Sequence, residues 1–393
     1  MLALEILLWL GLFSIFYTYL FYPKSLQFLA RNKKKQFEFE LLPIQNLPRI
    51  TIVMAAYNEE RVIEQKVRSV FNGNYPNELI DFWVGSDCSN DKTNEILTEL
   101  NKEYPTLKPH LFTERQGKIN IINHFLKDAP NDIIISTDAN NIFFENTIHE
   151  LVSALLSDDN IGIVDSNVVH SNTADFNKGI GMQEHYYLNS EVKTKLAEGV
   201  LFHTITLFGG CFAMRKKLWK DVPSNFLVDD FLIGLSVVMQ GYKSISNPKS
   251  QTFEDVNVDP IAEYRRKIRI GTGNFQVFFK HPLVLCNPFT KIGFVMFSHK
   301  ILRWFGPFVL IFSLIATLIL ATSHPVYCVL LGIEILSIFI SILDLCLRNI
   351  NIKLPLIRFI SHFYTSNICL LIGFFRYIKG VKSSIWSPTQ RFQ

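Results

Sequence analysis

The sequence predicts an α/β domain with a largely parallel sheet, flanked on both sides by membrane-spanning segments. Between residues 50 and 240, short apolar runs typical of buried strands alternate with helical patterns, and this alternation is characteristic of α/β folds. Apolar residues make up 48% of the 393 residues and concentrate at the two ends of the chain. The sequence therefore indicates a membrane protein with a soluble middle.

Charge and cysteine content argue against nucleic-acid binding, a disulfide framework and a zinc site. The formal net charge is only +4, and the Lys and Arg residues lie beside the apolar segments. This distribution favours orientation in a membrane over nucleic-acid binding. The 6 cysteines form no CxxC pair, so we expect reduced thiols and neither a disulfide framework nor a zinc site.

Residues 1–24 are expected to form an N-terminal transmembrane anchor. Residues 2–22 are almost continuously apolar, and about 20 helical residues span the hydrocarbon core. No small-residue cleavage site follows, which favours an anchor over a cleaved signal peptide. Because positive residues stay on the cytoplasmic side, the basic run at residues 31–35 predicts that the segment after it is cytoplasmic.

Residues 45–280 contain the predicted α/β domain. The expected strands are residues 50–56, 80–85, 108–112, 133–136 and 161–165, and the apolar run after the glycines at 209–210. The expected helices are residues 57–71, 94–103, 116–127, 147–156, 175–197 and 263–279, and residues 226–230 lead into a further helix that ends at Gln240. Glu59 and Glu60 would occupy the acidic first turn of the first of these helices.

The C-terminal third is predicted to associate with the membrane. Residues 289–304 are expected to form an interfacial amphipathic helix, because basic side chains lie among apolar ones there. Residues 305–380 are expected to hold two to three spans, at 305–322, at 326–347 and, as a third candidate, at 355–377.

The side of the membrane on which the tail, residues 381–393, lies is left open. Three C-terminal spans would place it outside if the middle of the chain is cytoplasmic. The basic residues Arg376, Lys379 and Lys382 favour an inside tail instead. One of the three segments would then be re-entrant or interfacial.

The expected strand at 133–136 leads to two oxygen-bearing side chains, Asp138 and Asn140. Ligands of α/β sheets bind at the carboxyl ends of strands. An oxygen pair with one residue between can hold a hard divalent cation against a diphosphate. The alternative is an Asx turn that merely ends the strand.

Four further polar residues each have a structural and a functional interpretation. Asp87 is either a ligand-binding carboxylate or an Asx cap of the next helix. Lys118 is either a phosphate-binding ammonium or a solvated helix lysine. Asp229 and Asp230 are either reactive carboxylates or the acidic first turn of a helix.

Taken together, six motifs resemble the inverting family 2 glycosyltransferases. The similarity is greatest to the membrane-embedded branch that includes cellulose, hyaluronan, chitin and poly-N-acetylglucosamine synthases. The motifs are Ala56-Tyr57-Asn58-Glu59, the polar turn at 85–93, Gly117-Lys118, Thr137-Asp138-Ala139-Asn140, Gly209-Gly210 and Asp229-Asp230. Their order and spacing are specific, and the resemblance implies a GT-A type, Rossmann-like fold.

The resemblance assigns donor binding to seven residues: Tyr57, Glu59, Asp87, Lys118, Asp138, Lys267 and Arg269. Among these, Asp87 would accept the uracil N–H, and Lys118 would lie near the diphosphate. Asp138 and Asn140 match the metal-binding Asp-x-Asp motif, with Mg²⁺ or Mn²⁺ as the implied cofactor. An amide carries less charge than a carboxylate, so we expect Asn140→Asp to retain activity and to tighten metal binding.

Asp230 matches the catalytic base of the family. This base takes the proton of the acceptor hydroxyl as that oxygen attacks the anomeric carbon with inversion. Adjacent carboxylates raise each other's pKa, which suits a base at neutral pH. Asp229 and the turn Gly209-Gly210-Cys211 match positions that contact the acceptor, where glycine permits a close approach.

The segment from Arg266 to Ile270 departs from the family. Processive members carry Gln-Arg-x-Arg-Trp there, and in this chain Arg266 replaces the Gln and Ile270 replaces the Trp that stacks on the acceptor. This departure leaves processivity and the identity of the acceptor open.

The resemblance implies transfer of a sugar from a UDP-sugar, such as UDP-GlcNAc or UDP-Glc, to a growing polysaccharide. The implied location is the bacterial inner membrane, with the catalytic domain in the cytoplasm and membrane lipid as a further partner. The alternatives are transfer of a single sugar to a lipid, such as a polyprenyl phosphate or diacylglycerol, and a transporter that senses nucleotide sugars. The sequence identifies no accessory subunit.

Overall fold

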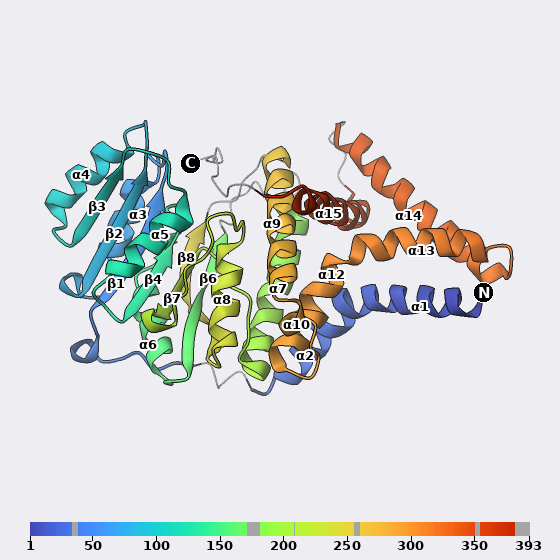
Figure 1. Ribbon diagram of the computed structural model, residues 1–393, viewed down its shortest axis with the longest axis horizontal. Coiled ribbons are helices and arrows are strands. Elements are labelled where there is room, and N and C mark those ends of the chain that lie inside the picture. Colours follow the sequence, from blue (N-terminus) through green and yellow to red (C-terminus); the bar gives the residue numbers. More distant parts are fainter. Residues whose placement is uncertain (34–37, 171–180, 208, 255–259, 350–353, 382–393) are drawn as a thin grey trace. The chain divides into compact units, whose positions relative to one another are not determined.

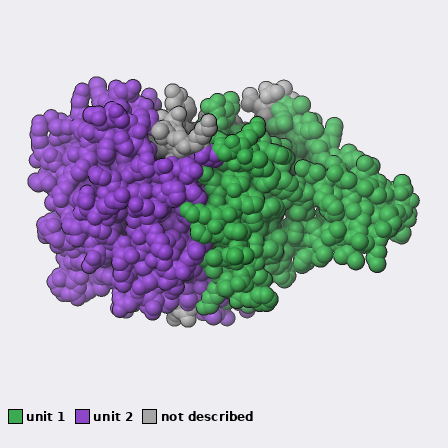
Figure 2. All heavy atoms as spheres, viewed as in Figure 1, with its two compact units in different colours: residues 1–29, 173–194, 259–380 green, residues 30–172, 195–258, 381–393 purple. Residues whose placement is uncertain are grey.

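The computed structural model describes residues 1–33, 38–170, 181–207, 209–254, 260–349 and 354–381 (Figure 1). Parts of three predicted segments therefore lie outside the described residues: 34–35 of the basic run, 175–180 of the long helix and 382–393 of the tail. The chain divides into two compact units, coloured separately in Figure 2. Unit 1 comprises Met1–Leu29, Thr173–Thr194 and Asp259–Gly380, and unit 2 comprises Ala30–Asn172, Lys195–Val258 and Val381–Gln393.

Unit 2 contains an 8-stranded sheet with the strand order β3-β2-β1-β4-β7-β6-β8-β5. The strands are β1 (Ile50–Ala56), β2 (Ile80–Asp87), β3 (Leu107–Phe112), β4 (Ile133–Thr137), β5 (Ile142–Phe143), β6 (Ile161–His170), β7 (Cys211–Arg215) and β8 (Lys243–Glu254). The strands β3, β2, β1 and β4 are parallel, whereas β7 is antiparallel to both β4 and β6. The predicted, largely parallel α/β sheet is confirmed, with β5 and β7 running against the other six strands.

Two strands, β5 and β8, were not predicted from the sequence. β8 is polar in composition, yet Ser244, Asn247 and Ser250 are all buried in it. Their side chains find partners in the fold: Asn247 Nδ2 donates to the carboxylate of Glu150 at 3.0 Å, and Ser250 Oγ donates to the carbonyl of Thr147 at 3.1 Å. Because these bonds satisfy the polar groups, the strand is buried without the apolar pattern that predicts burial.

The helices of unit 2 pack around this sheet (Figure 1). They are α3 (Ile63–Phe71), α4 (Thr93–Glu103), α5 (Lys118–Asp128), α6 (Thr147–Leu156) and α8 (Asp229–Met239). Helix α7 (Gly181–Phe202) begins in unit 1 and continues into unit 2 after Thr194.

The first helix of unit 2 begins later than predicted, at Ile63 and not at Tyr57. The residues before it form a turn whose backbone N–H groups bond to side chains of the loop after β2. Asn58 N donates to Ser89 Oγ at 3.2 Å, and Glu60 N donates to Asp91 Oδ2 at 3.1 Å. The expectation that Glu59 and Glu60 lie in the first helical turn is therefore wrong, because these loop contacts hold the segment in a non-helical path.

Unit 1 is helical. Its elements are α1 (Leu2–Phe16), η1 (Tyr17–Phe21), α2 (Tyr22–Ala30), α9 (Pro260–Lys280), α10 (Pro282–Leu285), α11 (Lys291–Val295), η7 (Met296–Ile301), α12 (Leu302–Trp304), α13 (Gly306–Leu320), α14 (Pro325–Asn349) and α15 (Pro355–Ile378). Among the described residues, Leu2–Ala30 and Pro325–Leu347 are long and apolar enough to cross a membrane. These two helices coincide with the predicted spans at 2–22 and 326–347.

The predicted span at 305–322 is only 15 residues of helix, α13. It reaches spanning length only together with Lys291–Trp304, from which it is bent by 57°. The described part of α15, where the third C-terminal span was expected, is not among the helices that meet the length and composition of a span. Arg358 and His362 interrupt its apolar character.

Glu191 of α7 is buried in unit 1 against three basic side chains. Its carboxylate lies 3.0 Å from His299 Nε2 and 3.2 Å from Lys300 Nζ, and it also bonds to Arg303. Arg303 Nη2 donates in turn to the carbonyl oxygen of Thr18, at 3.1 Å. Burial alone would raise the pKa of Glu191, but the three basic groups outweigh it and hold this pKa well below its usual range. The cluster thus ties α7 to η7, α12 and the N-terminal helix.

Glu191→Ala is expected to lower the free energy of unfolding by about 3–5 kcal/mol, because it leaves buried cations without their counter-charge. Thermal unfolding of the purified protein in detergent measures this loss. Glu64→Ala is the matched control, since Glu64 pairs with Arg68 at 3.0 Å with side chains that are 57% and 38% exposed. That exposed pair should contribute no more than about 1 kcal/mol. Equal shifts in the two variants would contradict the role of the cluster.

Candidate active site

Charged side chains from three separate motifs meet where β4 ends and where α5 and α8 begin. Lys118, the first residue of α5, places its Nζ 2.7 Å from Asp138 Oδ1 and 3.5 Å from Asp229 Oδ2. Asp138 directly follows β4, and Asp229 and Asp230 are the first two residues of α8. The fold therefore brings together carboxylates that are about ninety positions apart in the sequence, with one ammonium between them.

The environment of Asp230 favours a proton-accepting role. Burial, together with the neighbouring carboxylate of Asp229, raises the pKa of Asp230 to about 6, although Lys118 opposes the shift. A carboxylate with this pKa is ionised at neutral pH and holds a proton more strongly than an ordinary Asp. Burial lowers the pKa of Lys118, but Asp138 and Asp229 outweigh it and raise this pKa, so Lys118 stays charged.

Gly209 lies against the Asp230 side chain, and Gly210 lies against the turn that follows β4. Gly209 has a φ of +93°, and a Cβ added there would overlap the Asp230 carboxylate. A Cβ added at Gly210 would come within 2.6 Å of Asn141 Oδ1. The backbone also pairs here, since Asp138 N donates to the Gly210 carbonyl at 3.0 Å. A side chain at either position would therefore displace the side chain of Asp230 or of Asn141, and at Gly209 the positive φ also favours glycine.

Cys211, the third residue of the predicted acceptor turn, has a completely buried side chain. Burial raises the pKa of its thiol to about 12. The thiol is therefore neutral and turned into the protein, and any contact of Cys211 with an acceptor is limited to its backbone.

Lys66 of α3 is a buried residue of the site that sequence reasoning missed. Its side chain has no exposed surface, and its Nζ donates to Thr137 Oγ1 at 2.9 Å and to the carbonyl of Asn141. The ammonium also lies 3.5 Å from the ring centre of Phe143. Lys66 thereby holds both ends of the turn that carries Asp138. A signal was present, since Lys66 falls three residues after Ile63, on the buried face of the helix.

Two other predicted donor residues, Asp87 and Tyr57, are linked through Arg115 at the end of β2. The buried Asp87 carboxylate accepts bonds from Arg115 Nε at 3.0 Å, from Gly117 N at 3.1 Å and from Gln116 N. The Arg115 guanidinium lies 3.4 Å from the centre of the Tyr57 ring. Asp87 does not act as the helix cap considered above, because the N-cap of α4 is Lys92. Arg115 links two predicted residues and was not itself predicted.

Glu59 lies in the same region, where its backbone N donates to Thr93 Oγ1 at 2.9 Å. Lys267 and Arg269 belong to α9 of unit 1. Within that unit, Lys267 Nζ lies 2.9 Å from His362 Nε2 and 3.9 Å from Glu263 Oε1. A role for Lys267 and Arg269 in donor binding remains a prediction.

The candidate metal ligands are the Asp138 carboxylate and the Asn140 amide. Asn140 Nδ2 donates to Glu254 Oε1 at 2.8 Å, so its Oδ1 is turned to the other side. Among the described residues, this site included, no three His, Cys, Asp or Glu side chains form a group that would hold a metal. Two protein oxygens fit an ion such as Mg²⁺ that takes its other ligands from phosphates and water.

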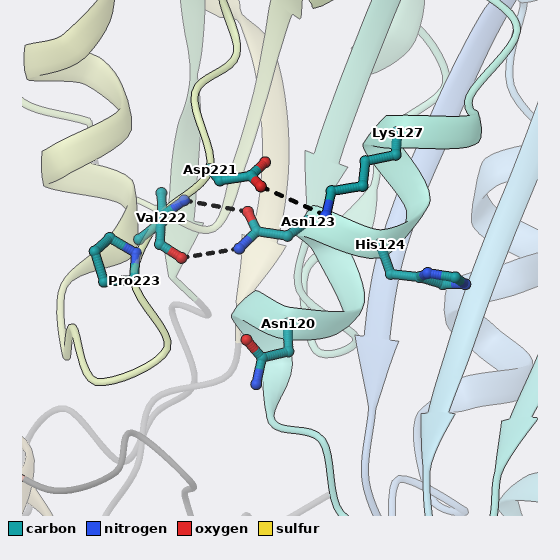
Figure 3. Close-up of a pocket in the computed structure, with 7 residues that line it drawn as sticks. All are labelled: Asn120, Asn123, His124, Lys127, Asp221, Val222 and Pro223. Atoms are coloured by element: carbon teal, nitrogen blue, oxygen red, sulfur yellow. Dashed lines mark hydrogen bonds and ion pairs between the residues drawn. The ribbon is translucent and has the colours of Figure 1, made fainter.

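A pocket of about 480 Å³ lies along α5, and no predicted site residue lines it. It is lined by Asn120, Asn123, His124, Lys127, Asp221, Val222 and Pro223 (Figure 3). Asn123 bonds to both the carbonyl and the N–H of Val222, at 2.8 and 3.2 Å, and Lys127 pairs with Asp221 at 3.6 Å. These polar contacts connect α5 to the loop at residues 221–223.

Comparison with known proteins tests the predicted family resemblance and the predicted fold. Residues 51–222 match the family model described as Glycosyl transferase family 2, so the predicted resemblance is confirmed for this part of the chain. The "Probable glycosyltransferase YdaM" of Bacillus subtilis is 24% identical over 251 residues, 60% of this chain and 58% of that protein. The poly-beta-1,6-N-acetyl-D-glucosamine synthase of Staphylococcus aureus is 22% identical over 266 residues, 67% of this chain and 62% of that protein.

A third relative matches over a shorter stretch. The beta-monoglucosyldiacylglycerol synthase of Trichormus variabilis is 40% identical over 96 residues, 24% of this chain and 20% of that protein. The chain thus spans less than two thirds of the length of each of these three relatives.

One solved structure is similar over nearly the whole chain. The mannosyltransferase PcManGT of Pyrobaculum calidifontis, determined in complex with GDP-Man and Mn²⁺, gives a TM-score of 0.68 at 20% identity. The similarity covers 95% of this chain and 99% of that one. It confirms the predicted GT-A type, Rossmann-like fold.

Lys66 provides a test of the buried part of the site through the pH dependence of stability. Burial lowers the pKa of Lys66 to about 7 in the folded protein, whereas an unfolded lysine titrates near 10.4. Between these values the unfolded chain binds more protons, so Lys66 makes stability rise with pH, by at most about 1.4 kcal/mol per pH unit. We expect Lys66→Met to lose this rise in a comparison of melting temperatures across pH 7 to 10.

Lys102→Met is the control for this prediction, because Lys102 is an exposed helix lysine paired with Glu99 at 2.7 Å. Its pH dependence should match that of the wild type. If the wild type and Lys66→Met gain stability equally with rising pH, Lys66 is not the group whose titration is responsible.

Proposed function

We propose that this chain is a membrane-bound inverting glycosyltransferase. Its residues 51–222 match the Glycosyl transferase family 2 model. The observation that carries the proposal is the convergence of Asp138, Lys118 and Asp230 at one edge of the sheet. The three residues come from separate motifs and supply a metal-binding carboxylate, a phosphate-binding ammonium and a base with a raised pKa. These are the groups that sugar transfer from a nucleotide requires.

The proposed reaction is a single displacement. Asp230 accepts the proton of an acceptor hydroxyl while that oxygen forms a bond to the anomeric carbon of the donor sugar. The bond from this carbon to the diphosphate oxygen breaks, and the electron pair leaves on the diphosphate, so the configuration inverts. Lys118 stabilises the negative charge that develops on the leaving diphosphate.

Asp138 and Asn140 are the residues that would hold Mg²⁺ or Mn²⁺. A bound divalent ion would supply charge neutralisation of the leaving diphosphate. The donor proposed is a UDP-sugar, with Asp87 as the acceptor of the uracil N–H and Tyr57, Glu59, Lys267 and Arg269 as further contacts. The support for Asp87 is its position at the end of β2, beside Tyr57 and Arg115.

The acceptor proposed is a growing polysaccharide, contacted at Gly209, Gly210, Cys211 and Asp229. The synthase of Staphylococcus aureus, named for poly-beta-1,6-N-acetyl-D-glucosamine, supports this choice. The alternative is one sugar transferred to a lipid, which the relative named beta-monoglucosyldiacylglycerol synthase favours. Product size on thin-layer separation distinguishes the two, since a polymer stays at the origin and a glycolipid migrates as one spot.

The proposed location is a bacterial inner membrane, with unit 2 in the cytoplasm. Two helices that meet the length and composition of a span support attachment to a membrane. The basic run after the first of these supports the orientation, because positive residues stay on the cytoplasmic side.

The test of the proposed function is UDP release by the purified full chain in nanodiscs, with a panel of UDP-sugars and Mn²⁺ or Mg²⁺. Asp230→Asn should reduce turnover by about 10² to 10⁴, because an amide cannot accept the proton. Its affinity for UDP should change little, since the base faces the acceptor. Asp229→Asn should be milder. Full turnover by a folded Asp230→Asn protein would exclude the mechanism.

The pH dependence of kcat/KM gives a second test of Asp230. Because Asp230 must be ionised and its pKa is raised to about 6, kcat/KM should fall as pH drops through about 6. The carboxylate of Asp229 is one cause of that raised pKa. Asp229→Asn should therefore move the acidic limb to lower pH. A limb that stays in place in this variant would point to another titrating group.

A further inference from the structure

The hydrogen bond between Asn140 and Glu254 defines the orientation of the Asn140 amide, which the motif alone does not. Asn140 stands where the Asp-x-Asp motif has its second carboxylate, and its Nδ2 lies 2.8 Å from Glu254 Oε1. Glu254 is the last residue of β8, the polar strand that the sequence did not predict. Nothing in the motifs singled out this glutamate.

We infer that Glu254 is a positioning residue that orients the Asn140 amide, and that the two side chains together replace the second aspartate of the metal-binding motif. This inference rests on the proposed function, because it assumes that the turn after β4 holds a divalent cation. It goes beyond that function by assigning a role to Glu254 and by predicting which residue pairs are compatible at positions 140 and 254.

The position of Glu254 is set by the strand ladder. β5 pairs with β8 in antiparallel register, with Ile142 opposite Phe253. The turn that carries Asn140 directly precedes β5, and Glu254 directly follows Phe253. Thr252 Oγ1 also donates to Asn141 Oδ1, at 3.3 Å. Glu254 is therefore held beside the turn by backbone pairing on the same strand.

The polarity of the bond fixes which end of the amide is free. An ionised carboxylate can only accept hydrogen bonds, so the NH₂ group of Asn140 must face Glu254. The amide oxygen then points away from Glu254 and is available to a cation. Without Glu254, the amide could turn by 180° and present N–H groups, which repel a cation. Glu254 thus selects the orientation in which Asn140 can act as an oxygen ligand.

The same polarity explains why asparagine is present. An aspartate at position 140 would place two carboxylates at hydrogen-bond distance, where they repel each other or one takes up a proton. The sequence-based expectation that Asn140→Asp tightens metal binding is therefore replaced by the opposite one. Glu254→Gln supplies an N–H donor, so combining it with Asn140→Asp would restore the bond with its direction reversed.

The experiment compares the wild type, N140D, E254Q and the double variant N140D/E254Q as full chains in nanodiscs. Binding of Mn²⁺ is measured in the presence of UDP and without any sugar, from the electron paramagnetic resonance signal of free Mn²⁺. N140D should weaken Mn²⁺ binding by on the order of tenfold or more, the size typical of lost supporting contacts to a ligand. The double variant should recover most of that loss. Melting temperatures confirm that all four proteins are folded.

The inference is overturned if N140D binds Mn²⁺ as tightly as the wild type, or if the double variant binds no better than N140D. It also fails if the wild type shows no UDP-dependent Mn²⁺ binding. UDP release from a UDP-sugar is measured on the same samples and tests the proposed function separately. Recovery of Mn²⁺ binding without sugar transfer would refute the function alone, and transfer without recovery would refute the pairing alone.

Discussion

The antiparallel pairing of β4 with β7 is the constraint on which the site depends. In a parallel sheet, all strands present their carboxyl ends at one edge, so β1, β2 and β4 deliver Tyr57, Asp87 and Asp138 to the same side. β7 runs the other way, with Cys211 opposite Thr137, and so brings the residues before it to that edge. The two glycines there have no side chains, which lets the Asp230 carboxylate and the β4 turn approach the same backbone.

The charges of the site depend on one another for the same reason. Asp138 and Asp229 share Lys118, and the ammonium stays protonated in its partly buried position because both carboxylates lie beside it. Asp230 has less of this compensation, and its pKa rises. The closest contacts of Lys66 are neutral groups, and burial among them disfavours its charged form and lowers the pKa of Lys66.

In unit 1, buried polar contacts and close helix packing hold the helices of that unit in place. Glu191 links α7 to basic residues of η7 and α12, and Arg303 of α12 reaches the backbone of the N-terminal helix. Helix α9, which carries Lys267 and Arg269, packs against α15 so closely that a Cβ added at Gly373 would meet Thr272 N at 2.8 Å. The placement of those two donor candidates is therefore decided by a neighbouring helix and not by the sheet.

The sequence by itself determined the alternation of strands and helices, the position of Asp138 at a strand end and the start of a helix at Asp229 and Asp230, because these follow from local patterns of apolar and acidic residues. Only the tertiary structure revealed β8, Lys66, Arg115 and Glu254. Burial in β8 is permitted by side-chain bonds to α6, about one hundred residues away, and no local periodicity records such partners. Asn140 and Glu254 are separated by 114 positions, so the orientation of the amide depends on strand pairing that the motif does not encode.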